Sequence, residues 1–456
     1  MSRIAQAVPE VASALQHVFL DAAQAAAGQS GWLQRERKLS GATFVQALVF
    51  GWLANPHASR SELAQAAAGA GVAITPQGME QRLNETAARL LQQVLEAAVA
   101  QMLAAPAVAV PLLRRFAGVY VSDSTIINLP ALLASQWPGS TATSAAGAAG
   151  SAALKAQVRL DLCQGSLHGP LLEAGRVHDA RAAKGHPALT QGALHIADLG
   201  YFNLAVFAAL HQGQAYYLSR AKANTLFWDQ SGQAALLSQW LEQAVAQGRE
   251  RAGVLELELH MGAQVGLPCR VLAVRVPPAV AAQRKAQLQR TAQRKQQAVS
   301  PERLALVQWT VLVTNVPATL LSVAEALVLY RARWQIERLF RLWKEVGQAD
   351  AWRSAKPWAV LCEVYAKLLG CLVQHWLLLV GAWADPARSW HKAAQVMHKQ
   401  AWHPGRTHLN AGRLKPQATT THSPPTRTVA PCGIACAGRL RVVVARDFSR
   451  WAPSVG

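Results

Sequence analysis

The chain has 456 residues, of which 51% are hydrophobic, so it can bury a sizeable core and is expected to fold as two or three domains. Its 45 Lys and Arg against 25 Asp and Glu leave a formal net charge of +20. Such a surplus favours a polyanionic partner, because each cation placed on a phosphate releases a condensed counterion. The first residues lack the apolar run of a secretory signal, and the scattered Cys fit a reducing compartment rather than a disulfide framework.

Helix signals fill residues 1–110, which are therefore expected to be all helical. Ser40 is placed to cap one helix, and Ser59 with Glu62 forms a capping box for the next. Thr75 precedes a proline, which is favoured as the first residue of a helix, so a further helix is expected to begin there.

Two of these helices are joined by the short turn 71–75, and the second is expected to continue through Leu90. Such a pair can form a helix-turn-helix, in which case residues 1–110 would be a DNA-binding domain. It can equally form a small helical bundle that enters no groove. The sequence leaves both interpretations open.

From Phe116 onward short apolar strands alternate with helices. A flexible Gly/Ala/Ser/Thr loop is expected at 139–153. A basic helix that interrupts the β-rich part is expected to expose its charges; its cations are Arg284, Lys285, Arg290, Arg294 and Lys295. The expected strands are 119–121, 158–162, 195–197, 216–219, 255–260, 270–276 and 309–314.

Helices are expected to resume at Ser322 and to continue to about Ala401. The most apolar part, 358–383, is long enough to cross a membrane. Polar side chains within it are costly in hydrocarbon and favour a buried core helix instead; they are Glu363, Lys367, Gln374 and His375.

The tail 402–456 has little hydrophobic periodicity and is expected to be poorly ordered. Cys432 and Cys436 lie in this tail without a second pair at zinc-ligand spacing. They are interpreted as ordinary thiols.

The segment 329–344 presents an unusual set of polar side chains if it is one helix. Each helical residue advances about 100°, so Tyr330, Arg333, Glu337 and Lys344 fall within about 60° of one another on one edge. The neighbouring face is apolar and is expected to pack on a sheet. The helix therefore presents an acid, two cations and a phenol together, although an amphipathic helix with a salt-bridged edge would show the same pattern.

Two aspartates, Asp123 and Asp198, each follow an apolar strand. A pair of divalent ions that clamps a phosphodiester needs several carboxylates from different elements, and magnesium prefers oxygen ligands. We therefore expect Asp123, Asp198 and Glu337 to converge on one point. Helix capping would explain either aspartate alone, and Asp161, a further strand acid, is the weaker candidate.

The order Tyr330, Arg333, Glu337 and Lys344 resembles the Tyr-Arg-Glu-Lys signature of the insertion-sequence-four family of bacterial DDE transposases. The resemblance covers about residues 35–400 and does not extend past Gly412. Four further stretches resemble, in the family's order, its two aspartate motifs, the strand that often follows and the strand that leaves its β insertion; they are 121–125, 198–202, 217–222 and 309–317.

The resemblance implies an α/β fold. It consists of a ribonuclease-H-like catalytic core with a mostly β insertion, preceded by an all-α N-terminal domain. The implied boundaries are 1–110 for the helical domain, 111–401 for the catalytic domain with the insertion at about 208–318, and 402–456 for a diverged tail.

The resemblance also implies the role of each site residue. Asp123, Asp198 and Glu337 would be catalytic and would bind two Mg²⁺ (or Mn²⁺) ions. Trp309 resembles the tryptophan that stacks on a flipped base, although a core tryptophan in a strand would fit equally well. The other implied DNA-binding residues are Arg333 and Lys344, which would hold phosphates, and Tyr330, which would support the flipped nucleotide.

The implied activity is cut-and-paste transposition of an insertion sequence, in which phosphodiester hydrolysis precedes strand transfer. The implied partners are double-stranded DNA, as terminal inverted repeats and as target, and a second copy of the chain in a synaptic homodimer. No membrane is implied, and the expected location is the bacterial cytoplasm at the nucleoid. Two alternatives remain: a nuclease of the same core without strand transfer, and a catalytically inactive DNA-binding or inhibitory protein descended from a transposase.

Overall fold

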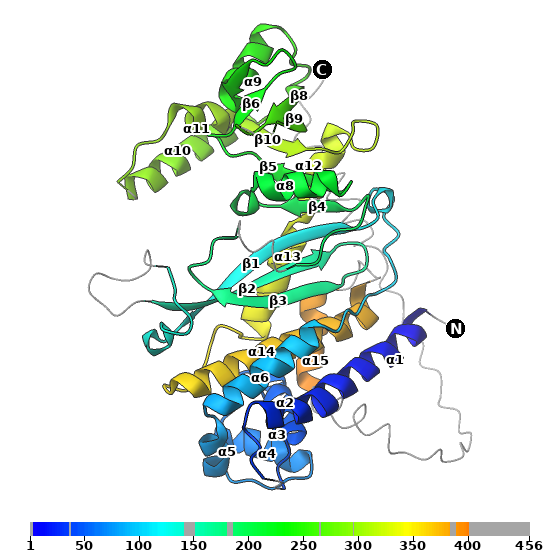
Figure 1. The fold of residues 1–456 in the computed structure, drawn as a ribbon, viewed down its shortest axis with the longest axis vertical. Helices are drawn as coiled ribbons and strands as arrows, with labels where there is room; N and C mark the ends of the chain where they lie inside the picture. Colours follow the sequence, from blue (N-terminus) through cyan, green and yellow to red (C-terminus); the bar gives the residue numbers. More distant parts are fainter. Residues whose placement is uncertain are drawn as a thin grey trace.

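The fold is described by a computed structural model, which covers residues 3–35, 38–140, 151–179, 186–263, 266–294, 296–383 and 389–400. Three regions follow one another along the long axis (Figure 1): a group of helices at one end, the widest part of a large sheet in the middle and a smaller mixed region at the other end. The expectations for most of the Gly/Ala/Ser/Thr loop, for Lys295 and for the tail with Cys432 and Cys436 lie outside the described residues.

The N-terminal region is helical where its capping signals indicate. Ser40 Oγ accepts from the Thr43 amide at 3.1 Å, and Ser59 forms the expected capping box with Glu62. The helices α3 and α6 pack on α14 (Pro357–Leu378), so they share their hydrophobic core with the C-terminal part of the chain. The helices of the N-terminal region are α1 Arg3–Gln16, a π-helical turn His17–Ala22, α2 Ala23–Gln29, α3 Gly41–Ala54, α4 Arg60–Gly69, α5 Pro76–Arg82 and α6 Glu85–Val99.

The helix predicted to continue through Leu90 is two helices. Leu83 leaves the helical conformation, and Asn84 begins α6 by accepting a hydrogen bond from the Ala87 amide at 3.1 Å. An asparagine side chain competes for backbone donors and so favours a cap over a helix interior. The prediction of one continuous helix was therefore wrong at this asparagine.

A single ten-stranded sheet runs through the molecule in the order β3-β2-β1-β4-β5-β10-β9-β8-β6-β7. β2 is antiparallel to β1 and β3, whereas β4 is parallel to both β1 and β5. The expected α/β class is confirmed. The strands are β1 Val119–Leu129, β2 Ala152–Asp161, β3 Leu167–Ala174, β4 Leu194–Ala197, β5 Tyr216–Arg220, β6 Leu226–Trp228, β7 Ala234–Leu236, β8 Val254–Met261, β9 Leu267–Arg275 and β10 Trp309–Thr314.

The first strand is much longer than predicted. Residues Tyr120 to Leu129 pair continuously with β2, so the polar segment that follows Val121 remains extended because its backbone groups are bonded on that side. Asp123 therefore lies inside β1. The expectation that it follows the end of the strand was wrong.

The strands from β6 to β10 extend the same sheet beyond β5, because β10 pairs with β5. A second hydrophobic core, which includes Phe227, Leu257 and Trp309, lies around these strands. The basic helix α10 has no fully buried residue and projects from this region (Figure 1), as predicted for a solvated helix, except that Arg284 is partly buried and bonds to β10. The helices here are α8 Leu204–Gln212, α9 Leu237–Ala246, α10 Pro278–Arg294 and α11 Pro301–Ala305.

The segment with the polar edge is not one regular helix. The Arg333 amide bonds to the Tyr330 carbonyl, only three residues back, at 3.3 Å, which tightens the chain for one turn. Beyond Arg341 the chain widens into a π-helical turn. The pieces are α12 Val323–Ala332, α13 Trp334–Arg341 and the turn Leu342–Val346.

The apolar helix α14 is buried in the protein. It is long and apolar enough to span a membrane, but 83% of its most apolar window is covered by the rest of the protein. Glu363 and Lys367 pair within it at 2.9 Å, and His375 Nε2 lies 2.7 Å from the Gly165 carbonyl oxygen. The prediction of a buried core helix is confirmed. α15 (Trp390–Gln400) follows it in the chain and packs against it.

Candidate active site

Asp123 lies on the face of β1 that α13 covers. Val121 and Ile127 share this face, since side chains alternate along a strand, and they belong to the same core as Ile336 of α13. The Ser124 amide donates to Asp123 Oδ1 at 2.8 Å. The acid is thus held in place by a paired strand and by its own neighbour.

The Arg333 guanidinium joins two of the predicted carboxylates. Nη1 lies 3.3 Å from Asp123 Oδ2, and Nη2 donates to Glu337 Oε1 one helical turn further along. Asp123 and Glu337, which are far apart in sequence, therefore meet at a single cation.

Asp198 reaches the same place at the end of β4. This strand is parallel to β1 with Ser122 opposite Ala197, so the next residue of each strand is an aspartate. The Tyr330 hydroxyl donates to Asp198 Oδ1 at 3.1 Å. The second aspartate is thus tied to the turn of α12 that precedes Arg333.

Negative charge is in excess at this site. Burial, with the charges of Asp198 and Glu337, raises the pKa of Asp123 to about 6, against the opposing effects of the Ser124 amide and the Arg333 guanidinium. Burial alone would lower the pKa of Arg333, but the three carboxylates raise it. Both shifts are those expected where several acids surround one cation.

The last residue of the polar set, Lys344, contacts β1 farther along the strand than Arg333 does. Its Nζ donates to the Ile126 carbonyl oxygen at 3.1 Å and lies 3.7 Å from Asp350 Oδ2. The π-helical turn carries this lysine, so its position does not follow from regular helical spacing. The four side chains of the set nevertheless lie along one strand and its neighbour, from Asp198 to Ile126.

Trp309 is not gathered with these residues. It is 4% exposed and lies in the second hydrophobic core, where the Arg275 guanidinium sits 4.3 Å from its ring centre. Its burial fits the alternative of a core tryptophan, while its predicted role in base stacking stays a prediction.

Asp161 is also separate from the three acids. It ends β2 and accepts a hydrogen bond from the Cys163 amide at 2.7 Å, which stabilises the following turn. This local role agrees with its lower rank among the strand acids.

Sequence reasoning missed the polar side of β2. Lys155, Gln157 and Arg159 are all at least 94% buried and occupy alternate positions of one strand. Buried polar groups of this kind need partners. The alternation Lys-x-Gln-x-Arg-x-Asp at 155–161 was a signal that could have revealed this layer.

The oxygen donors of the three acids fit a hard divalent cation, although two of the acids pair with an arginine in the structure. Among the described residues, no three His, Cys, Asp or Glu side chains are arranged around a common metal position. Asp123 and Glu337 instead hold Arg333. Carboxylate oxygens are the ligands that Mg²⁺ prefers. Three carboxylates near one guanidinium, two of them paired with it, leave negative charge unbalanced.

The sequence is similar to known transposases over most of its length. The 27% identity to the transposase for insertion sequence element IS231B of Bacillus thuringiensis subsp. berliner extends over 360 residues, 75% of this chain and 74% of that protein. Identity to the transposase for IS1151 of Clostridium perfringens is 23% over 271 residues, 57% and 56% of the two chains. A putative transposase for IS186A of Escherichia coli (strain K12) is 32% identical over 106 residues, 23% and 29% of the two chains.

Residues 114–373 match the model of a protein family described as a transposase DDE domain. This span exceeds half of the chain and contains β1, the end of β4 and α13, which carry the three acids. The chain therefore belongs to the family of DDE transposases.

Proposed function

We propose that the chain is the active transposase of an insertion sequence and catalyses metal-dependent cut-and-paste transposition. The observation that carries the proposal is that Asp123 and Glu337 pair with Arg333 while Asp198, held by Tyr330, lies close enough for its charge to raise the pKa of Arg333. A ribonuclease-H-like core is supported by the strand order β3-β2-β1-β4-β5, with three antiparallel strands followed by two parallel ones.

The three acids would hold two Mg²⁺ or Mn²⁺ ions. Such a pair supplies an activated water and stabilises the leaving oxygen of a phosphodiester. Arg333 occupies two of the carboxylates in the structure, so it competes with metal for Asp123 and Glu337. Once displaced, its planar guanidinium is suited to bind a phosphate of the DNA through two parallel hydrogen bonds.

Tyr330 would orient Asp198 and support a flipped nucleotide. Burial and the neighbouring Asp198 raise the pKa of Tyr330, so its hydroxyl stays protonated and remains a donor to the carboxylate. Stacking of the base on Trp309 would require Arg275 to leave its position over the ring.

Lys344 and the exposed helix α10 would bind DNA phosphates. Arg284 anchors α10 by donating to the Trp309 carbonyl oxygen and to Thr310 Oγ1 at 2.9 and 3.1 Å. Arg290 and Arg294 lie one turn apart on the exposed side of this helix, which carries no acid. An unpaired cationic edge of this kind suits a polyanion.

The proposed reaction has two steps: the first hydrolyses one phosphodiester bond, and the second exchanges one phosphodiester bond for another. Water attacks a phosphodiester at the element end and releases a 3′ hydroxyl. That hydroxyl then attacks a phosphodiester of the opposite or target strand and displaces its 3′ oxygen. The partners would be terminal inverted repeats and target DNA, held by a homodimer at the nucleoid of a bacterial cytoplasm.

A cleavage and strand-transfer assay tests this function. The full chain is incubated with Mg²⁺ and DNA that ends in the inverted repeats flanking its gene. The wild type should cut and join; Asp198→Asn should do neither, because its amide is a poor metal ligand. Asp229→Asn is the matched control, since Asp229 only stabilises an exposed turn around Ser231.

The same assay separates the alternatives. Cleavage without joining would identify a nuclease. Specific DNA binding by the wild type without any metal-dependent cleavage would identify an inactive, inhibitory relative and would contradict the proposal.

A further inference from the structure

A polar layer lies on the face of β1 opposite to Asp123; its Lys155 and Gln157 side chains are buried, whereas the Asp179 side chain is 28% exposed. Asp179 Oδ1 accepts three hydrogen bonds: from Ser124 Oγ at 2.9 Å, from Lys155 Nζ at 2.9 Å and from Gln157 Nε2 at 3.3 Å. The Tyr201 hydroxyl donates to Gln157 Oε1 at the other end of the layer. Neutral and charged donors thus converge on one carboxylate.

This layer connects the backbones that carry the two aspartates. Ser124 follows Asp123 in β1, and its side chain points to the opposite face of the sheet. Tyr201 ends the short 3₁₀ turn that begins after Asp198, and its amide bonds to the Asp198 carbonyl oxygen at 3.0 Å. The path from Ser124 through Asp179 and Gln157 to Tyr201 therefore spans both strands.

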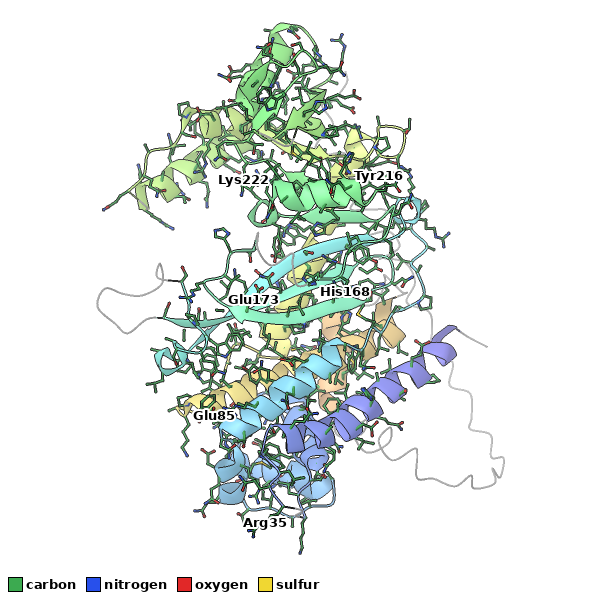
Figure 2. All side chains as sticks on the ribbon, viewed as in Figure 1. Arg35, Glu85, His168, Glu173, Tyr216 and Lys222 are labelled. Atoms are coloured by element: carbon green, nitrogen blue, oxygen red, sulfur yellow. The ribbon has the colours of Figure 1, made fainter. Side chains whose placement is uncertain are left out.

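The layer is supported from two further elements. Ser124 and Gln157 are directly opposite one another in the β1–β2 ladder, which sets the spacing of these two donors to Asp179. Gln157 Nε2 also lies 3.4 Å from Glu173 Oε2 on β3, where Figure 2 labels this glutamate. Lys155 Nζ donates to the Val177 carbonyl oxygen at 2.6 Å. The stretch from Val177 to Asp179 is thereby bonded to the sheet.

Stability alone is a poor explanation for this arrangement. Lys155 is 5% exposed, and burying a lysine costs more than burying an apolar side chain of similar size even when the lysine is paired. This charge holds Asp179, which bonds to Ser124 next to Asp123, so a displacement of this backbone would change the spacing of the carboxylates.

We propose that Asp179, held by Lys155, is a positioning residue that fixes Asp123 and Asp198 relative to each other for binding a divalent cation. The proposal rests on the proposed function, since it assumes that these acids bind metal. Residues that orient metal ligands from behind commonly contribute about 10- to 100-fold to metal affinity.

The test measures Mn²⁺ binding to the DNA-free chain by electron paramagnetic resonance of the free ion, and the Mg²⁺ concentration for half-maximal cleavage. Asp179→Ala should weaken both by about 10- to 100-fold. Asp179→Asn should recover part of the loss, because its oxygen still accepts from Ser124 and Gln157. Asp229→Ala, in an exposed turn, should bind Mn²⁺ as the wild type does.

Asp179→Ala leaves Lys155 buried without its acid and can prevent folding, so a second variant is needed that breaks the layer in a folded chain. Lys155→Met with Asp179→Leu replaces the pair by apolar side chains and should fold, yet it also breaks the layer. It should show the same loss of Mn²⁺ affinity at an unchanged melting temperature.

Wild-type Mn²⁺ affinity in this folded double variant would overturn the proposal. Failure of the proposed function gives a different result: the wild type itself would show neither a Mn²⁺ site nor cleavage. The two failures are therefore distinguishable.

Discussion

Replacing Lys367 by methionine would leave Glu363 without its partner in the middle of α14. Both side chains are 1% exposed and pair at 2.9 Å, and Lys367 Nζ also donates to the Ala351 carbonyl oxygen at 2.7 Å. Removing one member of a buried ion pair costs about 3–5 kcal/mol, because the other charge remains uncompensated. This cost is a large fraction of the free energy of unfolding of a typical protein, which is about 5–15 kcal/mol.

The measurement is urea unfolding followed by tryptophan fluorescence. Lys367→Met should lose about 3–5 kcal/mol, whereas Lys367→Met with Glu363→Leu should recover most of the loss, since no charge is left in the core. Arg89→Met is the matched control: it breaks a pair with Glu85 on the surface of α6, where both side chains are about half exposed, and should cost less than about 1 kcal/mol.

Additive effects of the two α14 substitutions would refute this reasoning. They would mean that the two charges do not interact and that each is solvated or neutral in the folded chain. A single variant as stable as the wild type would contradict the burial of the helix itself.

Three further outcomes are expected. Burial lowers the pKa of His375 from 6.5 to about 4, so as the pH falls below 6.5 this histidine is protonated in the unfolded chain before it is protonated in the folded one. The free energy of unfolding therefore decreases between pH 6.5 and 4. In urea titrations at several pH values, His375→Gln should remove about 3 kcal/mol of this decrease. Trp309→Ala should lower the free energy of unfolding by about 3–5 kcal/mol if the ring is a core residue, whereas a stacking role alone would cost about 1–3 kcal/mol at the base-flipping step. Arg290→Gln with Arg294→Gln should reduce the salt slope of DNA binding by about two, while Arg249→Gln with Arg251→Gln, the same charge change in the exposed turn between α9 and β8, should not.

Helix caps and apolar runs predicted many helices and strands, because each of these signals depends only on a few neighbouring residues. The caps at Ser40 and Ser59 are confirmed, and the apolar runs identify strands of the sheet and α14. The length of β1 was missed, since ten of its residues are held extended by pairing with a strand whose position no local signal records. The polar run after Val121 looks like a loop until that partner is known.

The sequence predicted that the acids of the site lie near one another, but not the place of Asp123 within its strand or the immediate contacts of the acids. Spacing placed Arg333 beside Glu337 on one helical edge, and the structure adds that the same guanidinium reaches Asp123 across the sheet. Asp179 was not found, because its link to Lys155 joins residues 24 apart across a strand pair and a loop. Such pairings become visible only when the sheet is assembled.

Glu337→Gln tests the central claim most directly. The substitution keeps the size and helix propensity of the side chain but removes the charge that a divalent ion requires. Glu345→Gln is the matched control, because Glu345 is exposed in the following π-helical turn and lies 3.8 Å from Arg341. Nicking of terminal DNA with Mg²⁺ is measured beside DNA binding without metal. We predict that Glu337→Gln binds DNA at least as tightly as the wild type and does not nick it, while Glu345→Gln does both normally. Nicking by Glu337→Gln at the wild-type rate would contradict the account and reduce Glu337 to a salt-bridge partner of Arg333.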